Sequence, residues 1–221
     1  MEPISEQRLR RSLVRLGRKV AAAGLVVASG GNLSARLPHG GMLVTVAGAG
    51  LDQLAPTDLV ALGPDGTAPA GQRPPSSEWR LHHAAYGARP DVAVAVHAHP
   101  PYATLLDALG QEIRLITTDH AFYVRRVARV GYLPSGTGAL AAAAAAALGG
   151  ADVVVLGHHG CLVVAGSPHA AWQRAANLEA AAQATYRALL LGDRDSRVPA
   201  DVLERLDAGA PDPADGRPGY M

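Results

Sequence analysis

The chain has 221 residues, of which 48% are hydrophobic and 18% are charged, and its formal net charge is +1. This composition excludes a disordered chain, and without a strong basic field we expect no nucleic-acid partner. The longest apolar stretch, residues 139–148, is mostly alanine and too short to cross a bilayer, so we expect no membrane partner either.

The first half of the chain begins with an amphipathic pattern. Apolar residues recur at helical spacing from Leu9 to Val20, with arginines between them, and this predicts an opening helix that ends at Gly24. Serines before Glu78 can cap a later helix, whose first turn then contains Glu78. The predicted elements are a helix over 5–23, a glycine-rich turn over 29–32, strands over 42–46 and 59–62, and a helix from 76 to 89.

The second half alternates strands with helices. The predicted elements are a strand over 92–97, a helix that begins at 100–101, a short strand over 113–116, an alanine-rich helix over 138–148, strands over 153–156 and 162–164, and a long helix over 167–191. The interleaving indicates the α/β class in the broad sense, although the spacing does not say whether the sheet is parallel. We place one domain over residues 1–208 and a tail rich in Pro, Gly, Asp and Ala over 209–221.

The single cysteine, Cys161, excludes a disulfide within the chain. The N-terminal residues lack the apolar core of a signal peptide, so we expect a cytoplasmic protein. Because Cys161 lies in an apolar run, we expect a buried structural thiol there and not a reactive one.

Histidines provide the strongest chemical signal. His97 and His99 are two residues apart at the end of a predicted strand, where side chains at i and i+2 share a face. Two adjacent imidazoles suit a metal ion, and the alternative is a pair of polar residues that leave the strand for solvent. His159 lies near glycines after another apolar strand and could supply a third nitrogen, and His158 competes for that role.

A second candidate site surrounds Glu78. This residue follows Ser76 and Ser77 at a predicted helix N-terminus, where free backbone N–H groups and the positive end of the helix dipole suit a phosphate. Glu78 could be a metal ligand or a general base, and the alternative is an ordinary glutamate in a capped first turn. The glycine-rich segment 29–34 exposes backbone donors that suit an anion, but it matches neither the dinucleotide fingerprint nor the P-loop.

Together these segments resemble the class II aldolase/adducin family, and their motifs are most similar to those of L-fuculose-1-phosphate aldolase. They follow in the family's order and spacing over residues 8–190. The matching segments are Ser29–Arg36, Val44–Gly48, Pro75–His82, Ala93–Pro100 and Leu156–Gly160. The resemblance implies a three-layer α/β/α fold around a central, largely antiparallel sheet. It also implies a homotetramer.

The resemblance further implies roles for particular residues. It implies one zinc ion per chain on His97, His99 and His159, because the family's third ligand directly precedes the glycine. Manganese, cobalt and iron also accept three imidazoles. It implies Glu78 as the catalytic acid and base. The implied phosphate-binding residues are Asn32, Gly48, Ser76 and Ser77.

Two parts of the chain depart from the family's pattern. The aldolases carry a hydroxyl residue before the glycine that matches Gly48, and Ala47 at that position removes one phosphate donor. The family also takes one tyrosine from a loop and another from a C-terminal arm. The candidates here are Tyr123, with His120 and Asp119 as alternatives, for the loop, and Tyr220 for the tail.

The implied activity is that of a zinc-dependent lyase, which cleaves a ketose 1-phosphate of the L-fuculose 1-phosphate type reversibly to dihydroxyacetone phosphate and an aldehyde. Zinc would polarise the carbonyl and Glu78 would take the α-proton. The sole lysine, Lys19, lies in mid-helix, which argues against Schiff-base chemistry. A 4-epimerase, a dehydratase or a decarboxylase would share the metal site. A non-catalytic adducin-like binding module is disfavoured, because the three histidines and the glutamate are all present.

Overall fold

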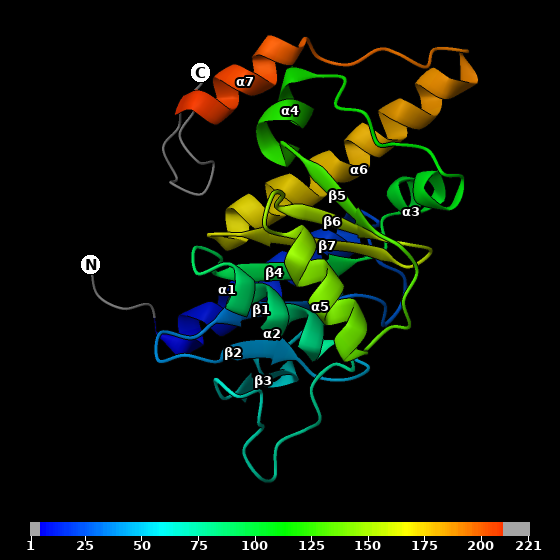
Figure 1. The fold of residues 1–221 in the computed structure, drawn as a ribbon. Helices are drawn as coiled ribbons and strands as arrows, with labels where there is room; N and C mark the ends of the chain where they lie inside the picture. Colours follow the sequence, from blue (N-terminus) through cyan, green and yellow to red (C-terminus); the bar gives the residue numbers. More distant parts are fainter. Residues whose placement is uncertain (1–4, 210–221) are drawn as a thin grey trace.

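The computed structural model describes residues 5–209 of the chain. Within them a seven-stranded sheet has the order β3-β2-β1-β4-β7-β6-β5 (Figure 1). The strands are β1 (Asn32–Arg36), β2 (Met42–Thr45), β3 (Leu59–Leu62), β4 (Val94–Ala98), β5 (Val127–Val130), β6 (Val153–Leu156) and β7 (Gly160–Ala165). All neighbouring strands are antiparallel except β5 and β6. The expectation of a largely antiparallel sheet is therefore confirmed.

Helices cover both faces of this sheet. They are α1 (Glu6–Ala22), α2 (Trp79–Ala88), α3 (Pro101–Ala108), α4 (Thr118–Val124), α5 (Gly138–Ala147), α6 (Pro168–Leu190) and α7 (Ala200–Gly209). One hydrophobic core joins α1, α3 and α6 to one face, and a second joins α2 and α5 to the other. The predicted three-layer α/β/α fold is confirmed. The helices α4 and α7 lie together beyond the β5 edge (Figure 1). Among residues 5–209, no helix has both the length and the apolarity that a membrane crossing requires.

The central strand β4 decides where the histidines point. Its residues are all buried, and they alternate between the two cores, with Val94, Val96 and Ala98 facing the α1/α6 layer and Ala95 facing the α2/α5 layer. Alternation along a strand puts His97 on the same face as Ala95. The imidazole of His97 therefore leaves the sheet toward α2, in the layer that also carries Glu78.

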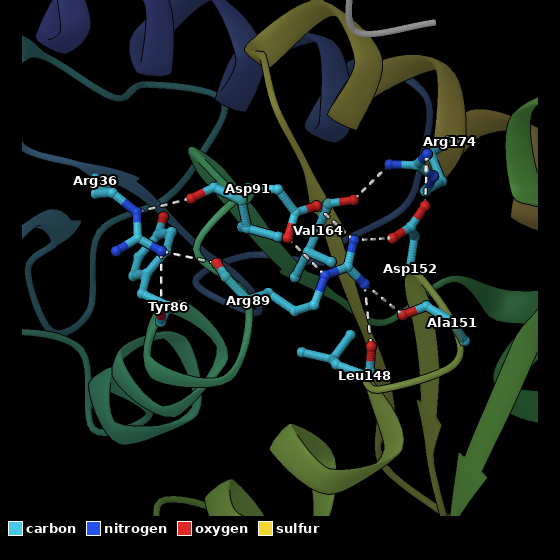
Figure 2. A network of polar contacts seen from close by, with 10 residues as sticks. Arg36, Tyr86, Arg89, Asp91, Leu148, Ala151, Asp152, Val164 and Arg174 are labelled. Carbon is cyan, nitrogen blue, oxygen red and sulfur yellow. Dashed lines mark hydrogen bonds and ion pairs between the residues drawn. The ribbon is translucent and has the colours of Figure 1, made fainter. Parts of the chain in front are cut away.

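An arginine network ties the two helical layers to the sheet (Figure 2). Arg89, at the end of α2, donates to the carbonyl oxygens of Leu148 and Ala151 and to the carboxylate of Asp152, 2.9 Å away. Asp152 also pairs at 2.9 Å with Arg174 of α6, which is buried. Since α2 and α6 lie on opposite faces, one carboxylate at the start of β6 joins both layers.

One predicted strand, over residues 113–116, is wrong. The segment is extended, but its backbone finds partners outside the sheet: Arg114 exchanges hydrogen bonds with the hydroxyl of Thr185 on α6, and the Leu115 carbonyl accepts from the Val198 N–H. An apolar pattern cannot distinguish a strand from an extended segment that packs against a helix.

Several elements were not expected. The strand β1 occupies part of the predicted glycine-rich turn, because its polar residues Asn32 and Ser34 are buried among polar partners and so hide the usual alternation. The helix α4 replaces a predicted loop, and β5 and α7 were not predicted. The remaining predicted helices and strands are confirmed to within a few residues at their ends. Apart from Gly209, the predicted tail, including Tyr220, lies outside the described residues.

We predict that Arg174→Met lowers the free energy of unfolding by about 3 kcal/mol, because Asp152 loses a buried partner and two carbonyl oxygens lose their donor. Urea denaturation measures the loss. Arg11→Met, on the exposed side of α1, is the matched control and should change stability little. Equal losses in both variants would contradict the role given to this network.

Candidate metal centre

Four side chains from three parts of the chain meet at one point. His97 is the penultimate residue of β4, His99 follows that strand, His159 lies in the turn between β6 and β7, and Glu78 precedes α2. Their candidate ligand atoms all lie within 4.8 Å of one another. The Nε2 atom of His97 is 2.7 Å from Oε2 of Glu78 and 3.0 Å from Nε2 of His99. The structure thus brings together the three predicted ligands and the predicted acid/base residue.

The tautomer of His97 explains why a cation fits this cluster. Its Nδ1 lies 2.9 Å from the carbonyl oxygen of Cys161, which can only accept, so Nδ1 carries the hydrogen. A neutral His97 then directs the lone pair of Nε2 toward Glu78 and His99, which also offer lone pairs. In addition, Oε1 of Glu78 is sealed from solvent and has no hydrogen-bond partner among the described residues. A divalent metal with nitrogen and oxygen ligands would satisfy all these atoms together.

The electrostatics favour the protonation states that bind a metal. Burial, together with the neighbouring His97 and His159, lowers the pKa of His99 to about 4, and burial also lowers the pKa of His159. Burial by itself would raise the pKa of Glu78, but its contact with His97 and the other nearby imidazoles outweighs burial and lowers this pKa to about 2. Neutral imidazoles and an ionised carboxylate are the forms that coordinate metals.

Two glycines allow neighbouring backbone segments to pack closely against the end of β4 that carries the histidines. A Cβ atom on Gly160 would lie 2.4 Å from the Ala98 carbonyl oxygen and 2.6 Å from the His99 ring. Gly31 has a φ of +77°, and a Cβ there would lie 2.8 Å from the His97 carbonyl oxygen. Side chains at either position would displace the strand end that carries the two histidines.

The turn before β7 presents His159 and leaves His158 outside the cluster. His158 is exposed and has a left-handed φ of +54°, and its N–H donates to Oδ2 of Asp107, 2.9 Å away. Asp107 is a buried residue of α3 that also pairs with Arg129. Sequence reasoning missed Asp107, because it lies far from the turn in the chain and carries no motif of its own.

The local structure at Glu78 differs from the prediction. The helix α2 begins at Trp79, so Glu78 is its N-cap residue and not a first-turn residue, and no side chain caps the helix. The Ser76 hydroxyl instead accepts from the Glu78 N–H at 3.3 Å. This position before the helix lets the Glu78 carboxylate turn away from α2 and toward His97.

The predicted phosphate-binding residues approach the same region. Asn32 is buried and lies directly opposite His97 in the β1–β4 pair. The segments that carry Gly48 and Ser76 run side by side, because Ser76 N–H donates to the Thr45 carbonyl oxygen and Ala47 N–H to that of Pro74. Ser77 follows on the same segment and is exposed.

Thr45 does not replace the hydroxyl that Ala47 lacks. Its side chain is 1% exposed, and its hydroxyl oxygen accepts from the Leu33 N–H inside the sheet. The hydroxyl of Thr45 is therefore directed at the neighbouring strand.

Tyr123 is not brought to the cluster within one chain. It lies on α4, which packs against α6 and α7, and within residues 5–209 no hydrogen bond joins its hydroxyl to the cluster. His120, one alternative, belongs to the capping box of α4, in which its N–H donates to the Thr117 hydroxyl. A catalytic role for Tyr123 stays a prediction.

Comparison with known proteins agrees with this geometry. The family model of the Class II Aldolase and Adducin N-terminal domain matches residues 11–186. The 5-methylthioribulose-1-phosphate/5-deoxyribulose-1-phosphate aldolase of Rhodospirillum rubrum is 36% identical, covering 92% of this chain and 91% of that protein. The 5-deoxy-D-ribulose 1-phosphate aldolase of Bacillus thuringiensis serovar kurstaki is 33% identical, covering 90% and 94%. A solved L-fuculose 1-phosphate aldolase superposes with a TM-score of 0.83 at 29% identity, covering 90% of this chain and 94% of that one.

We predict that the purified protein binds one divalent ion per chain, and that His159→Ala weakens binding by more than about 100-fold, because a directly coordinating group matters more than the partners behind it. Metal analysis and titration with zinc measure both quantities. His158→Ala is the matched control and should bind as the wild type does. Loss of metal from His158→Ala, with His159→Ala unaffected, would reverse the assignment.

We also predict that Asp107→Ala weakens metal binding about tenfold, because the turn that presents His159 loses the acceptor for its backbone N–H. Asp107→Asn, which retains an oxygen acceptor, should lose less. Arg129→Met removes the ion pair but keeps the carboxylate, and zinc titration should give the wild-type affinity. The same loss in Arg129→Met would show that the ion pair, and not the backbone contact, holds the turn.

Proposed function

The chain belongs to the class II aldolase and adducin family and is a metal-dependent lyase, and we propose that it cleaves a 5-substituted ribulose 1-phosphate by a reversible retro-aldol reaction. The products would be dihydroxyacetone phosphate and a short aldehyde. The observation that carries the proposal is the convergence of three imidazoles with a carboxylate, one oxygen of which has no hydrogen-bond partner among the described residues.

The choice of substrate rests on the relatives. The names of the two aldolases at 36% and 33% identity give 5-deoxyribulose 1-phosphate as a substrate, and one adds the methylthio analogue. The structural likeness to an L-fuculose 1-phosphate aldolase supports L-fuculose 1-phosphate as the second candidate. All of these are ketose 1-phosphates, so the proposed phosphate-binding residues would bind the same phosphate ester group in each substrate.

In this proposal His97, His99 and His159 hold one zinc ion. The bound metal would supply Lewis-acid polarisation of the ketose carbonyl and stabilise the oxyanion that develops there. Asn32, Gly48, Ser76 and Ser77 would bind the phosphate group and so place the carbon skeleton beside Glu78.

Glu78 would perform the proton transfer at C3. In the cleavage direction, the bond between C3 and C4 breaks, its electron pair moves toward the C2 oxygen, and the C4 hydroxyl loses its proton as the aldehyde forms. Glu78, as an acid, then delivers a proton to C3, and in the reverse direction its carboxylate removes that proton. The ionised carboxylate, whose Oε1 has no hydrogen-bond partner among the described residues, suits removal of the proton from C3. In the cleavage direction Glu78 would first take up one proton, which balances the proton that the C4 hydroxyl gives up.

A second group must take the proton of the C4 hydroxyl. Tyr123 remains our candidate, and because it is not brought to the cluster within one chain, it would come from a neighbouring subunit of a homotetramer. Light scattering that finds a monomer would remove this part of the proposal and leave the roles of the metal and Glu78 unchanged.

We predict that zinc-loaded protein forms dihydroxyacetone phosphate from 5-deoxyribulose 1-phosphate with a higher kcat/KM than from L-fuculose 1-phosphate. Glu78→Gln should lower kcat by at least about 100-fold, because general acid–base catalysis is lost. Glu112→Gln, an exposed glutamate paired with Arg197, is the control. If metal-loaded protein forms no product from either ketose, the aldolase proposal is contradicted. If Glu78→Gln remains active, the catalytic role of Glu78 is contradicted.

A further inference from the structure

A chain of buried polar side chains lies beside the metal centre and ends at Asn32. The Tyr86 hydroxyl is 2.7 Å from that of Ser34, which is 2.7 Å from Nδ1 of His82, and Nε2 of His82 contacts Oδ1 of Asn32. Ser34 and His82 are completely buried, and Asn32 and Tyr86 are 5% and 6% exposed. Polar groups so placed must largely satisfy one another, because Ser34 and His82 have no access to water and the other two have little.

The direction of these hydrogen bonds follows from the Tyr86 end. Burial raises the pKa of the Tyr86 hydroxyl, which therefore keeps its own hydrogen. That hydrogen has the Ser34 oxygen as its acceptor. The Ser34 hydroxyl must then donate to Nδ1 of His82. Burial is the main cause that lowers the pKa of His82 to about 3, so the ring is neutral, and with Nδ1 accepting from Ser34 its one hydrogen lies on Nε2.

The opposite direction is unfavourable. If Nδ1 of His82 carried the hydrogen and donated to Ser34, either the Ser34 or the Tyr86 hydroxyl would have no acceptor. An unsatisfied buried donor costs about 1–3 kcal/mol. The arrangement in which every hydrogen of the chain finds an acceptor ends with Nε2–H of His82 donating to Oδ1 of Asn32.

This direction determines which atom Asn32 offers to the site. With its oxygen engaged by His82, the carboxamide presents its nitrogen. Among the described residues this nitrogen has no hydrogen-bond partner, and it is not among the atoms sealed from solvent. Asn32 also faces His97 across the β1–β4 pair, so the free N–H groups lie next to the metal centre.

We propose that His82 is a positioning residue that holds the Asn32 carboxamide with its N–H groups toward the site, as donors to the phosphate of the substrate. The inference rests on the proposed function for the identity of the anion. A rotated carboxamide would present an oxygen lone pair to the phosphate, replacing an attraction with a repulsion. Because Ala47 supplies no hydroxyl, the orientation of Asn32 carries more of the phosphate affinity.

Nitrogen NMR of the wild type tests the direction of the chain independently of activity. In protein labelled with ¹⁵N-histidine, with His82→Gln used to assign the signals, we expect a neutral ring protonated on Nε2. Protonation on Nδ1 would overturn the inference, whatever the variants do.

Phosphate binding tests the consequence for the site. Titration of metal-loaded protein with inorganic phosphate should give an affinity about tenfold lower for His82→Leu, since a hydrogen bond to a charged group is lost. KM for the ketose phosphate should rise by a similar factor, with metal content unchanged. His82→Gln retains an N–H donor and should recover most of the loss. His83→Leu, the neighbouring histidine that contacts the Pro64 carbonyl oxygen, is the matched control and should bind as the wild type does.

A double-mutant cycle separates positioning from general damage. If His82 acts through Asn32, then His82→Leu should cause no further loss of phosphate affinity in an Asn32→Ala background. Independent, additive losses would overturn the inference. If the wild type binds no phosphate, the proposal of a phosphate-ester substrate and the role of Asn32 as a phosphate donor are both overturned. If the wild type cleaves the ketose and His82→Leu binds phosphate as tightly as the wild type, only the inference about His82 is overturned.

Discussion

The hydrogen bond from Nδ1 of His97 to the Cys161 carbonyl oxygen is the contact on which the site depends. It joins a side chain of β4 to the backbone of β7 and decides which ring nitrogen carries the hydrogen. The other nitrogen is then an electron-pair donor aimed at Glu78 and His99. Without this contact the ring could rotate or change tautomer, and the cluster would no longer present a set of donors to one cation.

The surrounding fold supplies the other members of this candidate metal cluster from elements that begin or end at the same place. The strand β4 ends between His97 and His99, α2 begins just after Glu78, and a turn held by Asp107 presents His159. Strand ends and helix starts are suited to this task, because their side chains leave the packed layers without burying unpaired backbone groups. The site therefore lies where the central strand β4 ends.

The polar side chains of β1 have an equally specific setting. Asn32 and Ser34 lie on a buried strand, where unpaired polar groups would be costly, and His82 and Tyr86 of α2 satisfy them. The same helix is therefore preceded by Glu78, the proposed proton-transfer residue, and carries along its buried face the partners of Asn32, a proposed phosphate-binding residue.

Much of the fold and of the site could be predicted from the sequence alone. Apolar runs and caps located β4, β6, α5 and α6, and the resemblance of the segments around His97, His99 and Glu78 to a known family predicted a metal-dependent lyase. These features are local, since each depends on a few neighbouring residues.

The strand over 113–116 was wrong and β1 was missed, because burial, and not periodicity, determines whether such segments pair with a sheet. The position of Glu78 before α2, the contribution of Asp107 and the partners of Asn32 required the tertiary structure. The contacts of Asp107 and of Asn32 join residues distant in the chain, and a linear pattern records residue types but not which backbone N–H or carbonyl oxygen a buried polar group will meet.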